Sequence, residues 1–138
     1  MTTTPVHPTL LPALAARRGA AFANFVDGEW VHAASGRRFE RRNPADTREL
    51  VGTFPASDDG DVAVAVDAAA MAFPAWRDTP LPQRGTLLAA AAGVMSRRAE
   101  ELAQALTWEE GKTLAESRQE VGRAIAYMLF IAGEGRRL

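Results

Sequence analysis

Cysteine is absent from the 138 residues of this chain, which excludes disulfide bonds, thiolate metal sites and thiol nucleophiles. Histidine is scarce, because His7 and His32 are the only two, too few to form a zinc site by themselves. No apolar run approaches the roughly 20 residues that a membrane-spanning helix needs. The sequence therefore offers no metal site, no membrane span and no cysteine chemistry.

The chain also lacks an excess of charge of either sign. Lys plus Arg number 16 and Asp plus Glu number 17, and the arginine pairs at 17–18, 41–42 and 97–98 stand far apart. A polyanion is attracted by a sustained positive field, which this balance does not supply. Nucleic acid and an anionic membrane are therefore not expected as partners.

The first 26 residues contain no acidic residue and include the stretch LLPALAARR. Prolines at positions 5, 8 and 12 interrupt this region, and no basic start precedes its apolar run. We predict a flexible N-terminal arm over residues 1–21. An organelle-targeting peptide is the alternative interpretation.

Short strands are predicted next. FVDGEWV, residues 25–31, alternates around Asp27-Gly28, a pair typical of a tight type I′ hairpin turn. Residues 39–42 and 50–54 read as two further strands, and residues 43–47 as the turn between them. Such short strands form a marginal sheet alone, so we expect them to pack against other elements.

The period becomes helical at Ser57, which suits an N-cap position. Pro74 is expected to end this first helix, with Trp76 in the connection that follows. A second helix is predicted over residues 82–96, because proline suits a first turn, and a third over residues 97–110. The positions expected to face inward are Val62, Val66, Ala69 and Phe73 in the first helix, Leu87, Leu88, Ala91, Val94 and Met95 in the second, and Leu102, Leu106 and Trp108 in the third.

A fourth helix carries the strongest signal. Gly111 suits the residue after a helix end, and Thr113 with Glu116 forms a capping box that starts a new helix of about twenty residues. Its predicted buried side is Leu114, Val121, Ile125, Met128 and Ala132, and its exposed side is Glu116, Arg118, Gln119, Glu120 and Arg123.

Apolar residues also spread beyond the buried side of this fourth helix. Leu129 and Phe130 extend the apolar arc almost round it, and Ile125 and Ile131 add to this surface. So wide an apolar surface is hard to keep in water. We infer that these residues pack against elements outside the given sequence.

Local motifs give no support for catalysis. GEGRR, residues 133–137, follows a helix where a dinucleotide-binding loop follows a strand, so we interpret it as a helix end. The adjacent carboxylates at 100–101 and 109–110 point about 100° apart on a helix, which favours a solvated face over an acid–base pair. His32 reads as an ordinary strand residue. We accordingly assign no catalytic, cofactor-binding or metal-binding residue.

Five segments, in this order and at these intervals, carry a family resemblance. They are FVDGEWV, SGRRFERRNPADTRELVGTFPAS, DVAVAVDAAAMAFPAWRDTP, EELAQALTWEEGKTLAESRQEV and IAGEGRRL. Together they resemble the N-terminal landmarks of the aldehyde dehydrogenase superfamily over residues 22–138. The combination looks closest to the α-ketoglutaric semialdehyde (2,5-dioxovalerate) dehydrogenases.

This resemblance implies an α/β, Rossmann-type parent fold, of which this chain is the mostly α N-terminal part. Residues 22–138 would belong to an incomplete NAD(P)-binding domain of a cytoplasmic, homo-oligomeric enzyme. The family oxidises aldehydes through a catalytic cysteine, and this chain has none, so the chain alone is expected to be inactive. NAD or NADP would be bound by the full-length parent and not by this chain, whose partners would be the remainder of the enzyme or other subunits.

The resemblance also places the fourth helix beside the substrate entrance. Gln119 and Arg123, four residues apart and so on one helix side, are the candidate substrate-entrance residues. An arginine there would suit the carboxylate of an acidic semialdehyde. The alternative is an exposed ion pair between Arg123 and Glu120.

Two other functions remain open on the sequence. The chain could be a stand-alone helical interaction module that binds a protein through the apolar surface at residues 125–131. It could also be an inactive remnant that joins a full-length dehydrogenase oligomer.

Overall fold

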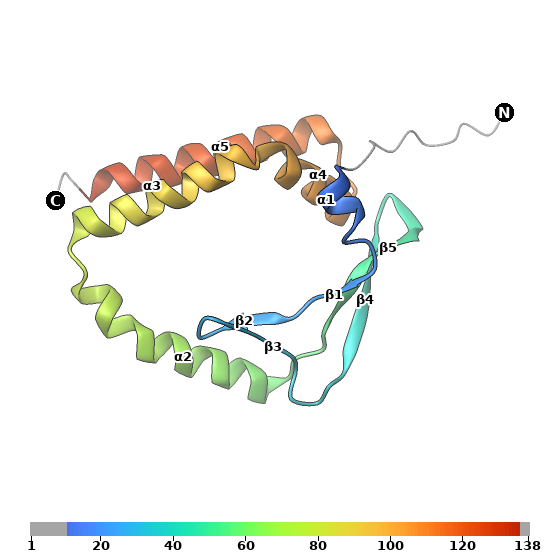
Figure 1. Cartoon of the computed structure of the whole chain (residues 1–138), viewed down its shortest axis with the longest axis horizontal. Helices are drawn as coiled ribbons and strands as arrows, with labels where there is room; N and C mark the ends of the chain where they lie inside the picture. Colours follow the sequence, from blue (N-terminus) through green and yellow to red (C-terminus); the bar gives the residue numbers. More distant parts are fainter. Residues whose placement is uncertain (1–10, 136–138) are drawn as a thin grey trace.

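A computed structural model describes residues 11–135 of the chain. Within them, short strands come first and four long helices follow (Figure 1). The elements in order are α1 (Pro12–Ala15), β1 (Ala20–Ala21), β2 (Asn24–Val26), β3 (Glu29–Val31), β4 (Arg38–Asn43), β5 (Asp46–Pro55), α2 (Asp59–Asp78), α3 (Leu81–Arg97), α4 (Ala99–Glu110) and α5 (Leu114–Glu134). The expected order of hairpin, short strands and four helices is confirmed.

The larger sheet has the order β1-β5-β4, with β1 parallel and β4 antiparallel to the central strand β5. Aromatic rings cover one region of it, where Phe54 stacks on Phe22 with ring centroids 4.8 Å apart and meets Phe39 at 5.9 Å. Val51 on β5 is fully buried. The strands predicted over residues 39–42 and 50–54 are present as β4 and β5, and both are longer than predicted.

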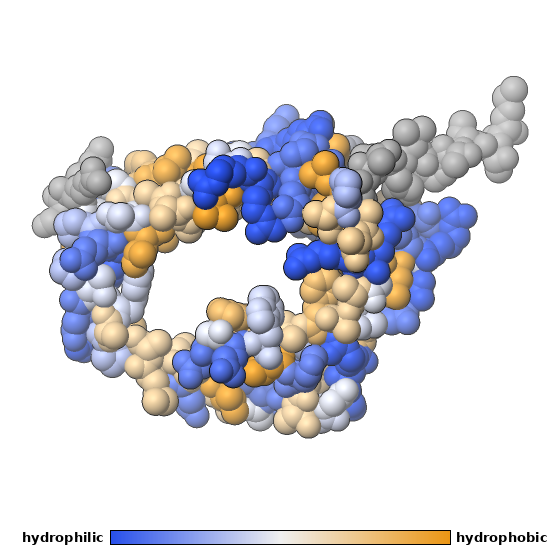
Figure 2. Space-filling view, viewed as in Figure 1, coloured by the Kyte–Doolittle hydropathy of each residue, from blue (hydrophilic) through white to orange (hydrophobic). Residues whose placement is uncertain are grey.

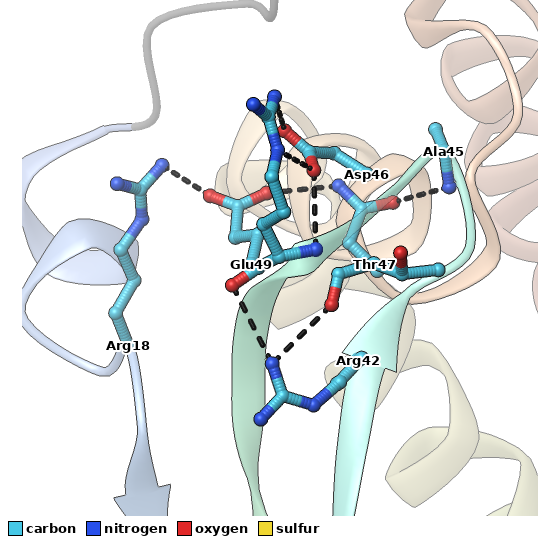
Figure 3. A network of polar contacts seen from close by, with 8 residues as sticks. Arg18, Arg42, Ala45, Asp46, Thr47 and Glu49 are labelled. Carbon is cyan, nitrogen blue, oxygen red and sulfur yellow. Dashed lines mark hydrogen bonds and ion pairs between the residues drawn. The ribbon is translucent and has the colours of Figure 1, made fainter.

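The turn between β4 and β5 is held by its own polar side chains (Figure 3). Asn43 is 2% exposed, accepts from the Ala45 amide at 2.9 Å and donates to Glu49 at 2.8 Å. Asp46 accepts from the Arg48 amide at 3.1 Å, as expected for this turn. Arg18 completes the group through an ion pair with Glu49. This network holds the turn that lies beside Gly111, the residue that ends α4.

The hairpin of β2 and β3 confirms the type I′ prediction. Asp27 and Gly28 both have positive φ, 51° and 81°, as this turn requires. Phe25 and Trp30 pair across the strands with ring centroids 5.0 Å apart. Trp30 nevertheless remains 72% exposed, so the hairpin covers its aromatic residues poorly.

Three predictions for the first long helix are wrong. The N-cap is Asp58, whose carboxylate accepts from the Gly60 and Asp61 amides, whereas the Ser57 hydroxyl accepts from Asn24. Pro74 lies inside α2, which continues to Asp78, because a proline removes one backbone hydrogen bond without preventing the next turns. Trp76 is consequently a helix residue and not part of a connection.

Helices α3 and α5 lie side by side (Figure 1). They approach closely at Gly85, where the Ala132 backbone leaves no room for a Cβ. The buried positions of α3 are Gly85 and Ala92, while Leu87, Ala91 and Val94 are exposed. The predicted apolar stripe of α3 is therefore wrong for those three residues. The prediction was based on side-chain hydrophobicity. At this interface the backbones of α3 and α5 lie too close together for large side chains to fit between them.

Helix α4 is bounded by Arg98 before its start and by Gly111 after its end. Arg98 interrupts the helix that was predicted over residues 97–110, so α4 begins at Ala99. Gly111 ends it with φ 77°, and a Cβ there would lie 2.9 Å from the Ala45 amide nitrogen. Thr113 and Glu116 form the predicted capping box of α5. On α5, Val121 and Ala132 are buried, as predicted.

The elements form an open ring, with α2 on one side and the α3–α5 pair on the other (Figure 1). The space-filling view in Figure 2 shows an opening through the middle of the molecule.

The N-terminal arm was predicted over residues 1–21. The structure describes this region from residue 11 onward, where it contains α1 and β1. The end of the arm at residue 21 stays a prediction. Within residues 11–135, no helix is both long and apolar enough to cross a membrane.

Candidate functional site

Exposed apolar residues around the ring are the main functional feature of the structure. Helix α2 has no buried residue along its 20 positions. The surface predicted on α5 is also uncovered, because Leu129, Phe130 and Ile131 are exposed and Ile125 is half-buried. Large apolar surfaces of this kind mark sites of association with other protein segments.

Gln119 and Arg123 lie on the exposed side of α5, as predicted from their spacing. Within residues 11–135, neither side chain has a hydrogen bond or ion pair. The alternative pairing of Arg123 with Glu120 is wrong, because Glu120 instead forms an ion pair with Lys112. Lys112 also pairs with Glu110 at 2.9 Å, and these two carboxylates raise the pKa of the lysine. Arg123 is therefore left available for an anionic group.

The adjacent carboxylates Glu100 and Glu101 serve separate ion pairs. Glu100 accepts two hydrogen bonds from Arg118, at 2.7 and 2.8 Å, and one from Gln104 at 3.2 Å. These bonds, that from Arg118 first, lower the pKa of Glu100 to about 2. Glu101 instead pairs with Arg98 at 2.6 Å. Each of the two adjacent carboxylates therefore has its own arginine partner.

Arg38 connects four parts of the sheet region, a role that sequence analysis missed. Its guanidinium donates to the carbonyl oxygens of Phe22 and Thr53 and to the Thr53 hydroxyl. It also lies 3.2 Å from Nδ1 of His32. His32 is exposed and belongs to this structural contact, in keeping with its interpretation as an ordinary residue. No sequence signal separates Arg38 from the neighbouring arginines at 37, 41 and 42.

A shallow hollow of about 270 Å³ lies between α3 and α5. Its lining offers one polar side chain, the hydroxyl of Thr86, which already donates to the Pro82 carbonyl. The hollow therefore has no free group that could orient a polar substrate. Its lining residues are Gly85, Thr86, Ala89, Leu129, Ala132 and Gly133.

The described residues offer few groups that could bind a metal ion or a dinucleotide. No group of three or more His, Asp or Glu within residues 11–135 could hold a metal ion. Backbone amides at a helix start can bind a dinucleotide phosphate, but those of α2 and α5 are already capped by Asp58 and Thr113. Helix α3 begins at Leu81-Pro82, where proline supplies no amide hydrogen.

Comparison with known proteins gives a consistent result. The sequence model described as "Aldehyde dehydrogenase family" matches residues 30–138. The chain is 45% identical over 102 residues to an α-ketoglutarate semialdehyde dehydrogenase of Haloferax volcanii, covering 74% of this chain and 21% of that protein. It is 43% identical over 116 residues to an α-ketoglutaric semialdehyde dehydrogenase of Bacillus subtilis, covering 84% and 24%.

A solved structure has the same arrangement. An NAD-dependent aldehyde dehydrogenase from Sinorhizobium meliloti matches with a TM-score of 0.83 and 36% identity, over 92% of this chain and 25% of that one. The chain thus spans about a fifth to a quarter of the length of these relatives. The open ring is present in a protein four times as long.

Proposed function

The chain belongs to the aldehyde dehydrogenase family, and we propose that it serves as the N-terminal frame of an NAD(P)-dependent aldehyde dehydrogenase. In this role the ring packs against the cofactor-binding and catalytic parts of the enzyme. Those parts convert an aldehyde, water and the oxidised nicotinamide cofactor into a carboxylate. The frame contributes no thiol nucleophile, because it contains no cysteine.

The observation that carries this proposal is the unburied helix α2. A helix that is apolar over most of its circumference is normally buried, yet no α2 residue is buried here. Phe73 and Trp76 are both exposed on this helix, which borders the opening seen in Figure 2. The same ring occurs in a dehydrogenase chain of which it is one quarter. The missing three quarters are the natural occupant of the opening.

Arg123 supports a carboxylated aldehyde as the substrate. Its guanidinium has no partner within residues 11–135, and Gln119 lies one turn away on the same side of α5. An arginine binds a carboxylate with two charge-assisted hydrogen bonds, and a semialdehyde with a distal carboxylate presents that group. The names of the two relatives at 43–45% identity agree with α-ketoglutaric semialdehyde as this substrate.

A chimaera tests the proposed frame function. Residues 22–138 of this chain replace the matching N-terminal segment of the B. subtilis α-ketoglutaric semialdehyde dehydrogenase. We expect aldehyde-dependent reduction of NAD or NADP by the chimaera and none by the 138-residue chain. The matched control is a chimaera with Val66→Glu and Phe73→Glu, which places charges on the packing side of α2 and should abolish assembly.

The chimaera also decides between the frame and a stand-alone interaction module. A folded but inactive chimaera that does not retain its cofactor-binding part would contradict the frame function. A chain that remains monomeric, folds cooperatively and binds another protein through Leu129, Phe130 and Ile131 would support the module instead.

A further inference from the structure

Arg84, in the first turn of α3, carries a buried donor that the described residues leave unsatisfied. Its Nε is buried and has no hydrogen-bond partner within residues 11–135. The whole side chain is half-buried, whereas Arg97 of the same helix is exposed. Water satisfies the N–H groups of an exposed arginine, but a buried N–H without an acceptor costs free energy. Arg84 therefore needs an acceptor that Arg97 does not need.

Neighbouring side chains do not supply this acceptor. Trp76, near the end of α2, lies against the guanidinium, with its ring centroid 5.8 Å from the Arg84 Cζ. An aromatic face attracts the cation, but it does not replace an oxygen acceptor for the N–H groups at the guanidinium edge. Asp78, the acidic residue that follows soon after Trp76, pairs with Arg77 at 2.7 Å. The described chain thus holds one face of the guanidinium and leaves the Nε–H unsatisfied.

This contact lies where α2 leads into α3, at one end of the ring (Figure 1). Trp76 is 43% exposed there, on a helix that has no buried residue. A segment that packs over Trp76 also removes water from the guanidinium beside it. A charge that loses its water needs an opposite charge and hydrogen bonds to remain favourable.

We propose that Arg84 binds an Asp or Glu carboxylate of the rest of the dehydrogenase, and so anchors the connection between α2 and α3 to that part. This inference rests on the proposed frame function and gives the chemistry of one contact within it. A carboxylate accepts two parallel hydrogen bonds, from Nε–H and a terminal N–H, and also neutralises the charge. A backbone carbonyl oxygen would satisfy the donor and leave the charge uncompensated.

One substitution in two contexts tests the anchor. Arg84→Met keeps an apolar stem and removes the charged group. In the 138-residue chain, which lacks the partner, it should leave the midpoint of urea unfolding unchanged or raise it, because an unpaired buried donor is removed. In the chimaera with the B. subtilis enzyme it should shorten the half-life of activity on heating about tenfold or more, because a buried carboxylate loses its partner.

Arg97→Met is the matched control, and it should change neither measurement. Equal destabilisation of the chain and of the chimaera by Arg84→Met would make Arg84 an internal support of α3 and would overturn the proposal. A chimaera that is active and as heat-resistant with Arg84→Met as without it would also overturn it, and would leave the frame function intact. A chimaera that is inactive with Arg84 in place would contradict the frame function and the anchor with it.

A charge swap tests whether the partner is a carboxylate. Arg84→Glu should place two carboxylates together and lower the activity of the chimaera, whereas Arg97→Glu should not. Random substitutions in the B. subtilis portion are then screened for restored activity. We expect restoration by a change of one Asp or Glu to Lys or Arg, and this change should lower activity when Arg84 is intact. Restoration by changes of uncharged residues only, or by no change, would overturn the carboxylate partner.

Discussion

Gly85 of α3 lies against the backbone carbonyl of Ala132 on α5, and the space between them cannot hold even a methyl group. This contact explains why small residues, and not the larger leucines, form the buried side of α3. It also makes the pairing of α3 with α5 sensitive to a single added carbon.

Gly85→Ala should therefore destabilise the chain by roughly 1–3 kcal/mol, because the added methyl forces the two helix backbones apart. Gly122→Ala on α5 is the matched control, since nothing lies within 4 Å of the Cβ position there. That variant should stabilise by about 0.5–1 kcal/mol through helix propensity. Urea unfolding followed by circular dichroism measures both, and effects of equal sign would contradict the close contact.

Glu100 should contribute to acid sensitivity. Its hydrogen bonds from Arg118 and Gln104 lower its pKa from 4.5 to about 2, so the folded state favours the ionised carboxylate. The stabilisation is present above pH 4.5 and is lost as the pH falls toward 2. Glu100→Gln should flatten the fall in unfolding temperature over this range. Glu109→Gln, which alters an exposed carboxylate of the same helix, should leave the slope unchanged.

Arg123 should discriminate between substrates in the chimaera. Arg123→Ala removes the group proposed to pair with a distal carboxylate, so KM for α-ketoglutaric semialdehyde should rise about tenfold or more. KM for propionaldehyde, which has no carboxylate, should change little. Arg97→Ala, on α3, is the matched loss of an exposed arginine. Equal increases for both aldehydes would remove Arg123 from the substrate entrance and leave the frame function intact.

Arg38 should be the most important arginine of the sheet region. Arg38→Met leaves the carbonyl oxygens of Phe22 and Thr53 without this donor and should cost roughly 1–3 kcal/mol of stability. Arg41→Met, on the same strand, removes an exposed arginine without a partner in residues 11–135 and should cost less than about 0.5 kcal/mol. Thermal unfolding of the two variants compares the loss of stability that each substitution causes.

Local chemistry made part of this structure predictable. The turn at Asp27-Gly28, the capping box of Thr113 with Glu116 and the helix end at Gly111 each depend on a few neighbouring residues. The order of motifs also identified the family. For these features the sequence contains the complete physical cause.

Other features depend on packing and were not predictable. Pro74 could not be placed inside α2 from its own preference, and Gly85 could not be identified as an interface residue from its hydrophobicity. The availability of Arg123 depends on Lys112 engaging Glu120 from the preceding connection. Apolar periodicity located the side of α5 that is buried, but it could not say which parts of α2 would remain uncovered.

Two routes join the N-terminal strand region to the helices α3, α4 and α5. One is covalent, through α2, and the other consists of local contacts, where Ala45 meets Gly111 and the Leu11 amide donates to Gln104 at 2.7 Å. If the contacts separate, α2 still holds the two sides at an effective concentration on the order of millimolar. Loss of these contacts would therefore leave the two sides connected within one molecule, with α2 as the covalent link.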